Sequence, residues 1–231
     1  MELREFMSIR RAYNLVRQSV EPSRRLTFEG FSILCHLEVS EVPVKTSDIA
    51  DYQGALRPTM THRTNHLAEL GFIERGEGPT DRRNIVCSIS AAGSEYVHDL
   101  AARTCACIAS GQSLARTNPE RIIKYADALG SLYCAAGDLV LLGLLGSKDR
   151  TSTVTGLVDK LGLLQPTVSM SVSALAKEGL VTREKSNPYS ARSLCVRLTD
   201  EGYEHANAVA DRISQLVVHR RSRHPKPDVA E

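Results

Sequence analysis

The sequence of 231 residues has no long hydrophobic run and almost no net charge. Its longest apolar stretch, Leu139 to Leu145, is much shorter than the roughly 20 residues that a helix needs to span a bilayer. No apolar region of the kind found in a signal peptide follows the start, MELREFMSIRR. We therefore expect no membrane partner and a cytoplasmic location. The formal net charge of +2 excludes a generally basic surface, so any binding of nucleic acid must depend on where individual arginines lie.

Spacings typical of metal, nucleotide or catalytic sites are also missing. The seven histidines form no H-E-x-x-H motif, and no glycine-rich loop of the phosphate-binding kind is present. Within a helix, the thiols of Cys105 and Cys107 would point about 200° apart, which suits neither a disulfide nor a shared metal. Cys87 alternates with apolar strand residues and is expected in the core. No nucleophile, base and orienting group recur together, so we predict no metal, no cofactor and no enzymatic activity.

The sequence does contain a long internal repeat. The stretch from Arg57 to Gly93 returns in altered form from Gln165 to Gly202. An offset of 108 residues superposes identical residues, which are Asp51 and Asp159, Gly54 and Gly162, Leu56 and Leu164, Pro58 and Pro166, Thr59 and Thr167, Leu67 and Leu175, Ala68 and Ala176, Gly71 and Gly179, and Arg75 and Arg183. One extra residue then shifts the offset to 109 and aligns Arg83 with Arg192. A period of this length indicates a duplicated domain.

Each copy has the local pattern of a helix followed by two strands. Pro58 and Pro166 suit the first turn of a helix, where a backbone N–H has no partner within the helix. Apolar residues then recur at helical spacing, and Gly71 or Gly179 suits the left-handed residue that commonly ends a helix. Beyond a loop, apolar residues alternate as in strands, at Ile85, Cys87 and Ile89 and again at Leu194, Val196 and Leu198. A winged helix-turn-helix domain has this order.

Further helices are predicted around these segments. They span residues 2–20, 27–38, 46–52, 91–110, 119–134, 138–146, 154–160 and 200–219. Residues 111–119 break the periodicity and are the best candidate for a linker. We therefore expect a first winged-helix domain with dimerisation-type helices at 1–116, a second winged-helix domain at 117–218 and a disordered basic tail at 219–231. The tail is either a solubilising end or an accessory clamp for phosphate. The predicted fold class is mainly α with small β-hairpin wings, in which two tandem winged helix-turn-helix domains form a pseudo-dimer.

At these residues the sequence resembles the MarR family of bacterial transcription regulators. The segment QPTVSMSVSALAKEGLV, at 165–181, is similar to the family's P-T-V-S helix and L-x-x-x-G-L-V turn. Asp81, Arg82 and Arg83 stand at the place of the family's D-x-R wing motif, whereas the second wing keeps Arg192 but has lost the aspartate. The resemblance covers roughly residues 26–110, the first copy, and 134–215, the second copy. Two such domains in one chain resemble the two-domain members of the SarA-like branch, which implies a covalently joined dimer.

The resemblance implies a DNA interface on the second helix and the wing of each copy. In the first copy the candidate residues are Arg57, Thr59, Thr61, His62, Arg63 and His66 on the helix and Arg82 and Arg83 on the wing. In the second copy they are Gln165, Thr167, Ser169, Met170 and Ser171 on the helix and Arg192 on the wing. Which of them read bases and which hold phosphate is left open. Arg83 is either a contact in the minor groove or a solvated loop arginine. Because the second set has little charge, we expect the first copy to supply most of the affinity.

The function that the resemblance implies is sequence-specific binding of double-stranded DNA by a transcription regulator. One chain would act as a pseudo-dimer on an asymmetric operator, because the two helices carry different side chains; a homodimer that uses one copy per chain is the alternative. The protein would then be associated with the nucleoid. Many family members respond to small aromatic or anionic ligands, which makes a small-molecule effector a second candidate partner. Two other functions stay open, those of a tandem winged-helix replication initiator and of a winged-helix adaptor that binds proteins.

Overall fold

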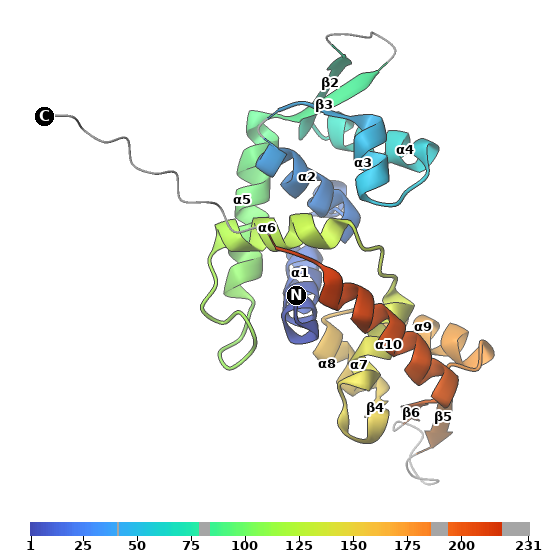
Figure 1. Cartoon of the computed structure of the whole chain (residues 1–231). Coiled ribbons are helices and arrows are strands. Elements are labelled where there is room, and N and C mark those ends of the chain that lie inside the picture. Colours follow the sequence, from blue (N-terminus) through green and yellow to red (C-terminus); the bar gives the residue numbers. More distant parts are fainter. Residues whose placement is uncertain (41, 79–83, 186–193, 219–231) are drawn as a thin grey trace, which may run out of the picture.

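The structure is a computed structural model that describes residues 1–40, 42–78, 84–185 and 194–218. It is mainly helical with two small antiparallel sheets, which confirms the predicted class of a mainly α protein with small β hairpins. Figure 1 shows the sheets and their helices in two lobes, with α1 (Leu3–Ser19) and α6 (Pro119–Gly130) between them. None of the described helices is long and apolar enough to cross a membrane.

The first lobe contains the first copy of the repeat. In chain order its elements are α2 (Phe28–Ser40), β1 (Val44–Lys45), α3 (Thr46–Tyr52), α4 (Arg57–Glu69), β2 (Ile73–Glu77), β3 (Ile85–Ile89) and α5 (Ala91–Ala106). The strand order of the sheet is β1-β3-β2, with Ile73 opposite Ile89 and Val44 opposite Cys87. Two helices followed by a hairpin are the arrangement expected of a winged helix.

The second lobe repeats this arrangement. Its elements are α7 (Ala136–Leu145), a 3-10 turn (Lys148–Arg150), β4 (Thr151–Thr153), α8 (Val154–Leu161), α9 (Gln165–Lys177), β5 (Val181–Lys185), β6 (Leu194–Leu198) and α10 (Asp200–Gln215). The strand order is β4-β6-β5, with Val181 opposite Leu198 and Ser152 opposite Val196. These pairs are the equivalents, at offsets of 108 and 109 residues, of the pairs in the first sheet. The two sheets therefore have the same strand order and the same register.

The turns between helix and strand are also duplicated. Gly71 and Gly179 have φ angles of +75° and +76°, in the left-handed region that favours glycine. Ser90 and Thr199 cap the helices that follow the hairpins, since each hydroxyl oxygen accepts a hydrogen bond at 3.0 Å from the backbone N–H three residues later. Each hydroxyl also donates to the carbonyl of the glycine, at 2.6 Å in the first copy and 2.8 Å in the second. The same local contacts thus fix the hairpin to its neighbouring helices in both copies.

Several elements differ from their predicted extent. Helix α5 ends at Ala106 instead of 110, and α10 ends at Gln215 instead of 219. Helix α6 (Pro119–Gly130) begins at the predicted position 119, with Asn118 as its N-cap, but ends before the predicted position 134. The strands β1 and β4 were not predicted, because two or three residues are too few to show an alternation of apolar and polar side chains.

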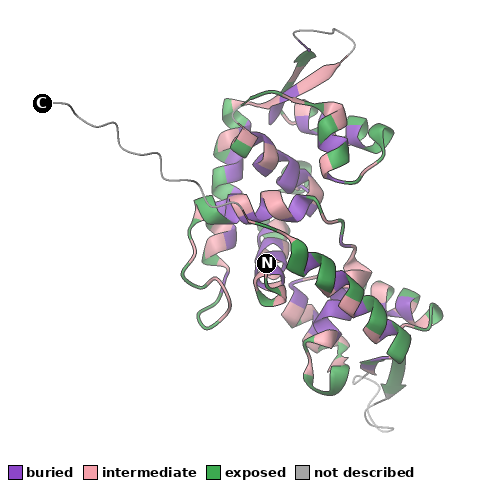
Figure 2. Ribbon diagram, in the orientation of Figure 1, coloured by how far each residue is buried: buried purple, intermediate pink, exposed green. Residues whose placement is uncertain are grey.

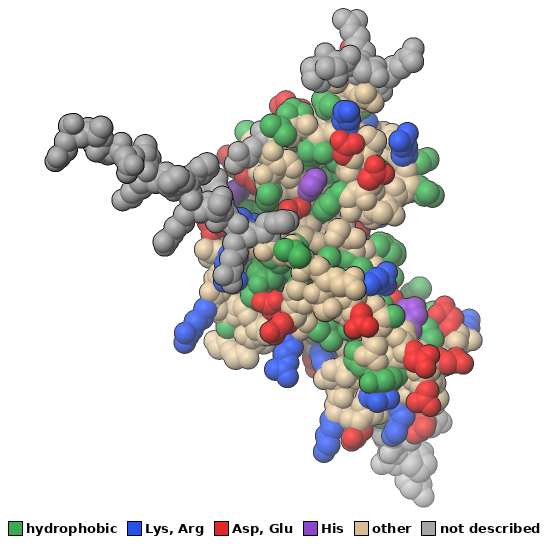
Figure 3. All heavy atoms as spheres, in the orientation of Figure 1, with side chains coloured by type: hydrophobic (Ala, Val, Ile, Leu, Met, Phe, Trp, Pro, Cys, Tyr) green, Lys and Arg blue, Asp and Glu red, His purple; other side chains and the backbone are tan. Residues whose placement is uncertain are grey.

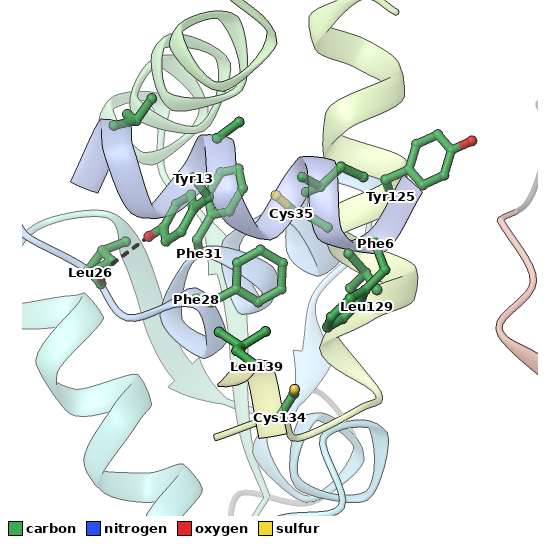
Figure 4. Close-up of a cluster of buried hydrophobic side chains, with 14 of the residues drawn as sticks. Phe6, Tyr13, Leu26, Phe28, Phe31, Cys35, Tyr125, Leu129, Cys134 and Leu139 are labelled. Atoms are coloured by element: carbon green, nitrogen blue, oxygen red, sulfur yellow. Dashed lines mark hydrogen bonds between the residues drawn. The ribbon is translucent and has the colours of Figure 1, made fainter. Parts of the chain in front are cut away.

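The core lies mainly between α1 (Leu3–Ser19), α2, α6 and α7. Figure 4 shows its aromatic centre, where the ring of Tyr13 stacks on that of Phe31 with centroids 4.8 Å apart. The hydroxyl of Tyr13 donates to the carbonyl of Leu26 at 3.2 Å, so its polar end is satisfied. Leu129 of α6 and Leu139 of α7 are buried in the same cluster. Residues from both sides of the predicted linker at 111–119 therefore share one core, and Figure 2 shows the buried residues on the inward sides of the helices.

Helices α1 and α6 connect the two copies. Three side chains of α1 donate hydrogen bonds to carbonyls at the end of α8, at 2.7 to 2.9 Å, and these are Arg11 to Asp159, Asn14 to Leu161 and Gln18 to Gly162. Helix α6, which precedes the second copy in the chain, packs on α2 and α5 of the first copy. Helix α1 thus holds the short helix of the second copy, although it precedes the first copy in the chain.

Candidate nucleic-acid interface

Helix α4 presents one buried face and one exposed face. Met60, Thr64 and Leu67 are buried, which is the helical stripe expected from their spacing. Pro58 lies in the first turn, as predicted. The residues on the other side that were predicted to face a DNA groove and that are exposed are Arg57, Thr59, Thr61, His62 and His66. The structure therefore brings five of the six predicted helix residues of the first copy to the surface.

Arg63, the sixth of these residues, lies differently. It is half-buried, and its Nη1 donates a hydrogen bond to Oε1 of Gln53 at 2.7 Å. Gln53 is buried and itself donates to the carbonyl of Glu29 and to the hydroxyl of Ser32, both at 3.0 Å. Arg63 is thus part of a polar network that joins α4 to the end of α3 and to α2. This contact gives its guanidinium a structural role, whether or not the side chain also reaches DNA.

Two basic residues outside the predicted set lie beside α4. Lys45 is exposed at the end of β1, and Arg75 is half-buried in β2. Nη1 of Arg75 donates to Oδ1 of Asn65 on α4, while its Nε is buried without a hydrogen-bond partner. Together with Arg57, these cations line a hollow of about 230 Å³ between β1, α3, α4 and β3. The sequence signal for Arg75 was its coincidence with Arg183 in the repeat, whereas nothing in the sequence distinguished Lys45.

Helix α9, the equivalent of α4, has a different surface. Its buried face is Val168, Val172 and Leu175, again at helical spacing. Of the predicted interface residues, Gln165 and Met170 are exposed and Thr167, Ser169 and Ser171 are half-buried. The Met170 side chain is 74% exposed, unusual for a large apolar residue in the middle of a helix. The predicted interface residues of α9 are therefore uncharged and partly apolar, whereas those of α4 include Arg57 and Arg63.

The charges on two helices, α10 of the second lobe and α4 of the first, differ in sign. In the second lobe the exposed N-terminal half of α10 carries Asp200, Glu201 and Glu204. Figure 3 shows acidic and basic side chains mixed over this lobe. In the first lobe, Glu69 is the one acidic residue of α4, and it lies 4.0 Å from His66. Helix α4 therefore carries Arg57 and Arg63 against one acidic residue, a charge that suits contact with phosphate.

The predicted wing residues lie outside the described part of the chain. These residues are Arg82, Arg83 and Arg192. The predicted basic tail at 219–231 also lies outside it. Both hairpins that lead to the wings are described, so the positions from which the wings project are known, and the roles of the three arginines stay predictions.

A groove of about 1010 Å³ lies next to the first copy, lined by α2, α3, α5, α6 and the end of the chain after α10. On its wall, Nδ1 of His36 lies 2.9 Å from Oδ1 of Asp127, and the rings of His36 and Tyr52 stack with centroids 4.0 Å apart. The Tyr52 hydroxyl donates to the backbone carbonyl of Asp127. Burial and the nearby Asp127 carboxylate raise the pKa of Tyr52, which stays a neutral donor. These contacts join α3, the first helix of the helix-turn-helix, to α6.

The cysteines of the described residues form no site with one another. All six are free, and no group of three or more histidine, cysteine or acidic side chains within the described ranges is placed to hold a metal ion. Cys87 is fully buried, as its place in the strand pattern predicts. Sγ of Cys105 lies 3.4 Å from the carbonyl of Thr117, and burial raises the pKa of its thiol. These features are those of thiols that pack as apolar groups.

Comparison with known proteins places the first copy in a family. The model of the MarR family matches residues 26–85, which run from the start of α2 to the start of β3, and this segment is a MarR-family domain. No curated protein is similar to the chain. Among solved structures, the chain is similar to the YusO protein from Bacillus subtilis, with 20% sequence identity and a TM-score of 0.35, over 44% of this chain and 67% of that chain. The family match therefore covers the copy that carries the basic helix.

Proposed function

We propose that the chain is a transcription regulator that binds specific sequences of double-stranded DNA. The observation that carries the proposal is α4, the second helix of a MarR-family winged helix, whose outer face is exposed and bears Arg57, His62 and His66. A helix in this position of a helix-turn-helix enters the major groove, where arginine and amide side chains distinguish base pairs. A protein that acts in this way works on the nucleoid, in the cytoplasm.

A single chain contributes both reading helices in this proposal. The shared core and the hydrogen bonds from α1 to α8 hold the two copies together in one chain, as the halves of a dimer are held. Successive major grooves on one face of a duplex are roughly 34–36 Å apart, and this is the spacing that α4 and α9 must match. Because α4 and α9 differ at several exposed positions, such as Arg57 against Gln165 and His62 against Met170, the preferred site is asymmetric. Most of the affinity comes from α4 and its wing.

Selection from a random duplex library with the purified chain, followed by a salt titration of the best site, tests this function. We expect enrichment of an asymmetric site and an affinity that falls steeply as salt rises, since released counterions drive such binding. Enrichment of a perfect palindrome with two chains bound would instead identify a homodimer that uses one copy per chain. If no sequence is enriched and binding stays weak at low salt, the proposed function is wrong, and a protein-binding adaptor becomes the better explanation.

The groove beside α2 and α6 supports a small-molecule effector as second partner. Its volume, about 1010 Å³, is at the upper end of the range of roughly 300–1,000 Å³ common for ligand sites. Its walls combine apolar Val39 and Ile123 with the polar His36, Tyr52 and Asp127. A ligand that moved Asp127 would act directly on α3, because Tyr52 binds the carbonyl of that residue.

Substitution in this groove tests the effector proposal. A panel of small aromatic acids is screened for compounds that raise the melting temperature and shift the DNA affinity. Val39→Trp, which fills the groove, should abolish both effects of an active compound. Val42→Trp is the matched control, because Val42 is 65% exposed and lies outside the groove lining. Equal loss in both variants would show that the compound binds elsewhere.

A further inference from the structure

The hollow beside α4 is lined by charged side chains of one sign. Three of the residues that line it are cations, Lys45, Arg57 and Arg75, and none is acidic. They come from three different elements, β1, α4 and β2, so the fold and not a local run of sequence brings them together. Such convergence of positive charge on one small concave surface favours a single anionic group.

The described residues do not neutralise these three cations. No ion pair to Lys45, Arg57 or Arg75 occurs among the described residues, although other cations, such as Arg103 with Asp99 at 3.3 Å, do form them. Arg75 is held in place by its hydrogen bond to Asn65 and has a second, buried guanidinium nitrogen without a partner. Its charge is therefore fixed at the edge of the hollow, with few conformations left to lose when an anion binds.

The hydroxyl groups of Ser47 and Thr61, which line the hollow, already donate to other acceptors and are not the donors for an anion. The Ser47 hydroxyl donates to Oδ1 of Asp48 at 3.1 Å, and the Thr61 hydroxyl donates to the carbonyl of Arg57 at 3.0 Å. Within the described ranges, the ammonium of Lys45 and the guanidinium of Arg57 are charged donors of the hollow without an acidic partner. Charged donors of this kind bind phosphate oxygens more strongly than neutral hydroxyls do.

The second copy lacks this arrangement. At the offset of 108 residues, Lys45 and Arg57 become Thr153 and Gln165, and only Arg183 remains of the three cations. Nη1 of Arg183 lies 3.4 Å from Ser173, the equivalent of Asn65, so the strand-to-helix contact is kept although the charge around it is not. Two of the three cations are therefore not needed for the winged-helix fold itself, which is built without them in α8, α9 and β5.

We propose that Lys45, Arg57 and Arg75 form a seat for one phosphate of the DNA backbone, and that this seat exists in the first copy alone. The inference rests on the proposed DNA-binding function and adds to it the residues that fix the register of α4 on the duplex. One phosphate held between β1, α4 and β2 anchors the helix at its N-terminal end, where Arg57 and Thr61 lie. Phosphate contacts of this kind orient a reading helix without reading sequence.

Ethylation interference on the selected duplex tests the seat, because ethylation removes the charge of one phosphate at a time. For the unchanged chain, we expect that ethylation of one particular phosphate weakens binding. For the double variant Lys45→Ala, Arg57→Ala, ethylation of that phosphate should have no effect on binding. Each single variant should lose interference at that same phosphate. The double variant should also bind with a weaker dependence on salt. Loss of one phosphate contact is expected to reduce the slope of log affinity against log salt by about 0.9. The ratio of the affinity of the unchanged chain to that of the double variant should therefore fall about threefold between 50 and 200 mM salt.

The second copy supplies the matched control. Gln165→Ala and Arg183→Ala should leave interference at this phosphate unchanged, and circular dichroism should show all variants folded. Loss of interference at two different phosphates by Lys45→Ala and Arg57→Ala, or no loss in the double variant, would overturn the seat while leaving DNA binding intact. If the unchanged chain binds no duplex at all, the proposed function fails, and the seat fails with it.

Discussion

The α-carbon of Gly93 packs against the carbonyl of Phe72, so closely that a β-carbon at position 93 would overlap the carbonyl oxygen. This contact brings the start of α5 onto the turn that follows α4. Gly202 makes the same approach to Leu180 in the second copy. In both copies the glycine also provides the N–H that caps the helix. Glycine is therefore required at positions 93 and 202 because there is no room for a β-carbon, and not because of the backbone conformation.

Alanine at position 93 or 202 should destabilise the protein to a similar extent. Because the obstacle is backbone, the helix must shift, and we expect a loss of roughly 1–3 kcal/mol in the free energy of unfolding for each, as for other overpacked sites. Gly137→Ala is the control, since a β-carbon there meets only Leu175 at an ordinary 3.7 Å. Denaturant unfolding measures the three variants. A Gly93→Ala protein as stable as Gly137→Ala would show that the contact is not tight.

The duplicated parts of the fold could be predicted from sequence because they depend on local chemistry. Helical spacing, terminal glycines and alternating strand residues act within a few residues of each other, so α4, α9 and both hairpins were found at their places. What could not be predicted depends on contacts between distant segments. The inward turn of Arg63 depends on Gln53, the clamp of α1 on α8 joins residues more than 140 apart, and Lys45 meets Arg75 only through the sheet. Exposure of a helix position can be read from periodicity, but a hydrogen-bond partner cannot.

Removal of the α1 clamp should loosen the second copy selectively. Asn14→Ala with Gln18→Ala deletes two hydrogen bonds to the end of α8, of 2.9 and 2.7 Å. Each bond is expected to contribute roughly 0.5–1.5 kcal/mol. Hydrogen exchange should become faster in α8 and α9 and stay unchanged in α3 and α4, which serve as the internal control. Equal acceleration in both copies would mean that α1 stabilises the whole core and not the second copy in particular.

Arg63→Ala should affect stability, in contrast to Arg57→Ala. The first change leaves the buried Oε1 of Gln53 without its donor, which we expect to cost about 1–3 kcal/mol. Arg57 is exposed, so its loss should change the free energy of unfolding by less than about 0.5 kcal/mol. Thermal unfolding without DNA separates the two. If the variants are equally stable, the contact with Gln53 contributes nothing, and a role of Arg63 in binding DNA becomes the better explanation for its place on α4.

The buried thiols should be unreactive in the folded protein. Burial raises the pKa of Cys134 to about 12 and that of Cys35 well above its ordinary value. At pH 8 the thiolate fraction of Cys134 is then about one in ten thousand, and the thiolate is the reactive species. A thiol reagent followed by mass spectrometry should label neither residue at pH 8, whereas all six cysteines should react in denaturant. Rapid labelling of Cys35 or Cys134 in the folded state would contradict their burial.

The two wings should contribute unequally to DNA binding. Arg83→Ala should weaken binding and reduce the salt dependence by about one unit of slope, as expected when a cation that contacts phosphate is removed. Arg192→Ala should do less, because its copy presents Gln165 and Met170 where the first presents Arg57 and His62, so the second wing approaches the duplex without a basic helix to hold it there. Titrations of the selected site at several salt concentrations compare the variants, with the pair Arg83→Lys and Arg192→Lys as controls that keep the charge. Equal losses for the two alanine variants would remove the asymmetry between the copies, and the preferred site should then be close to a palindrome.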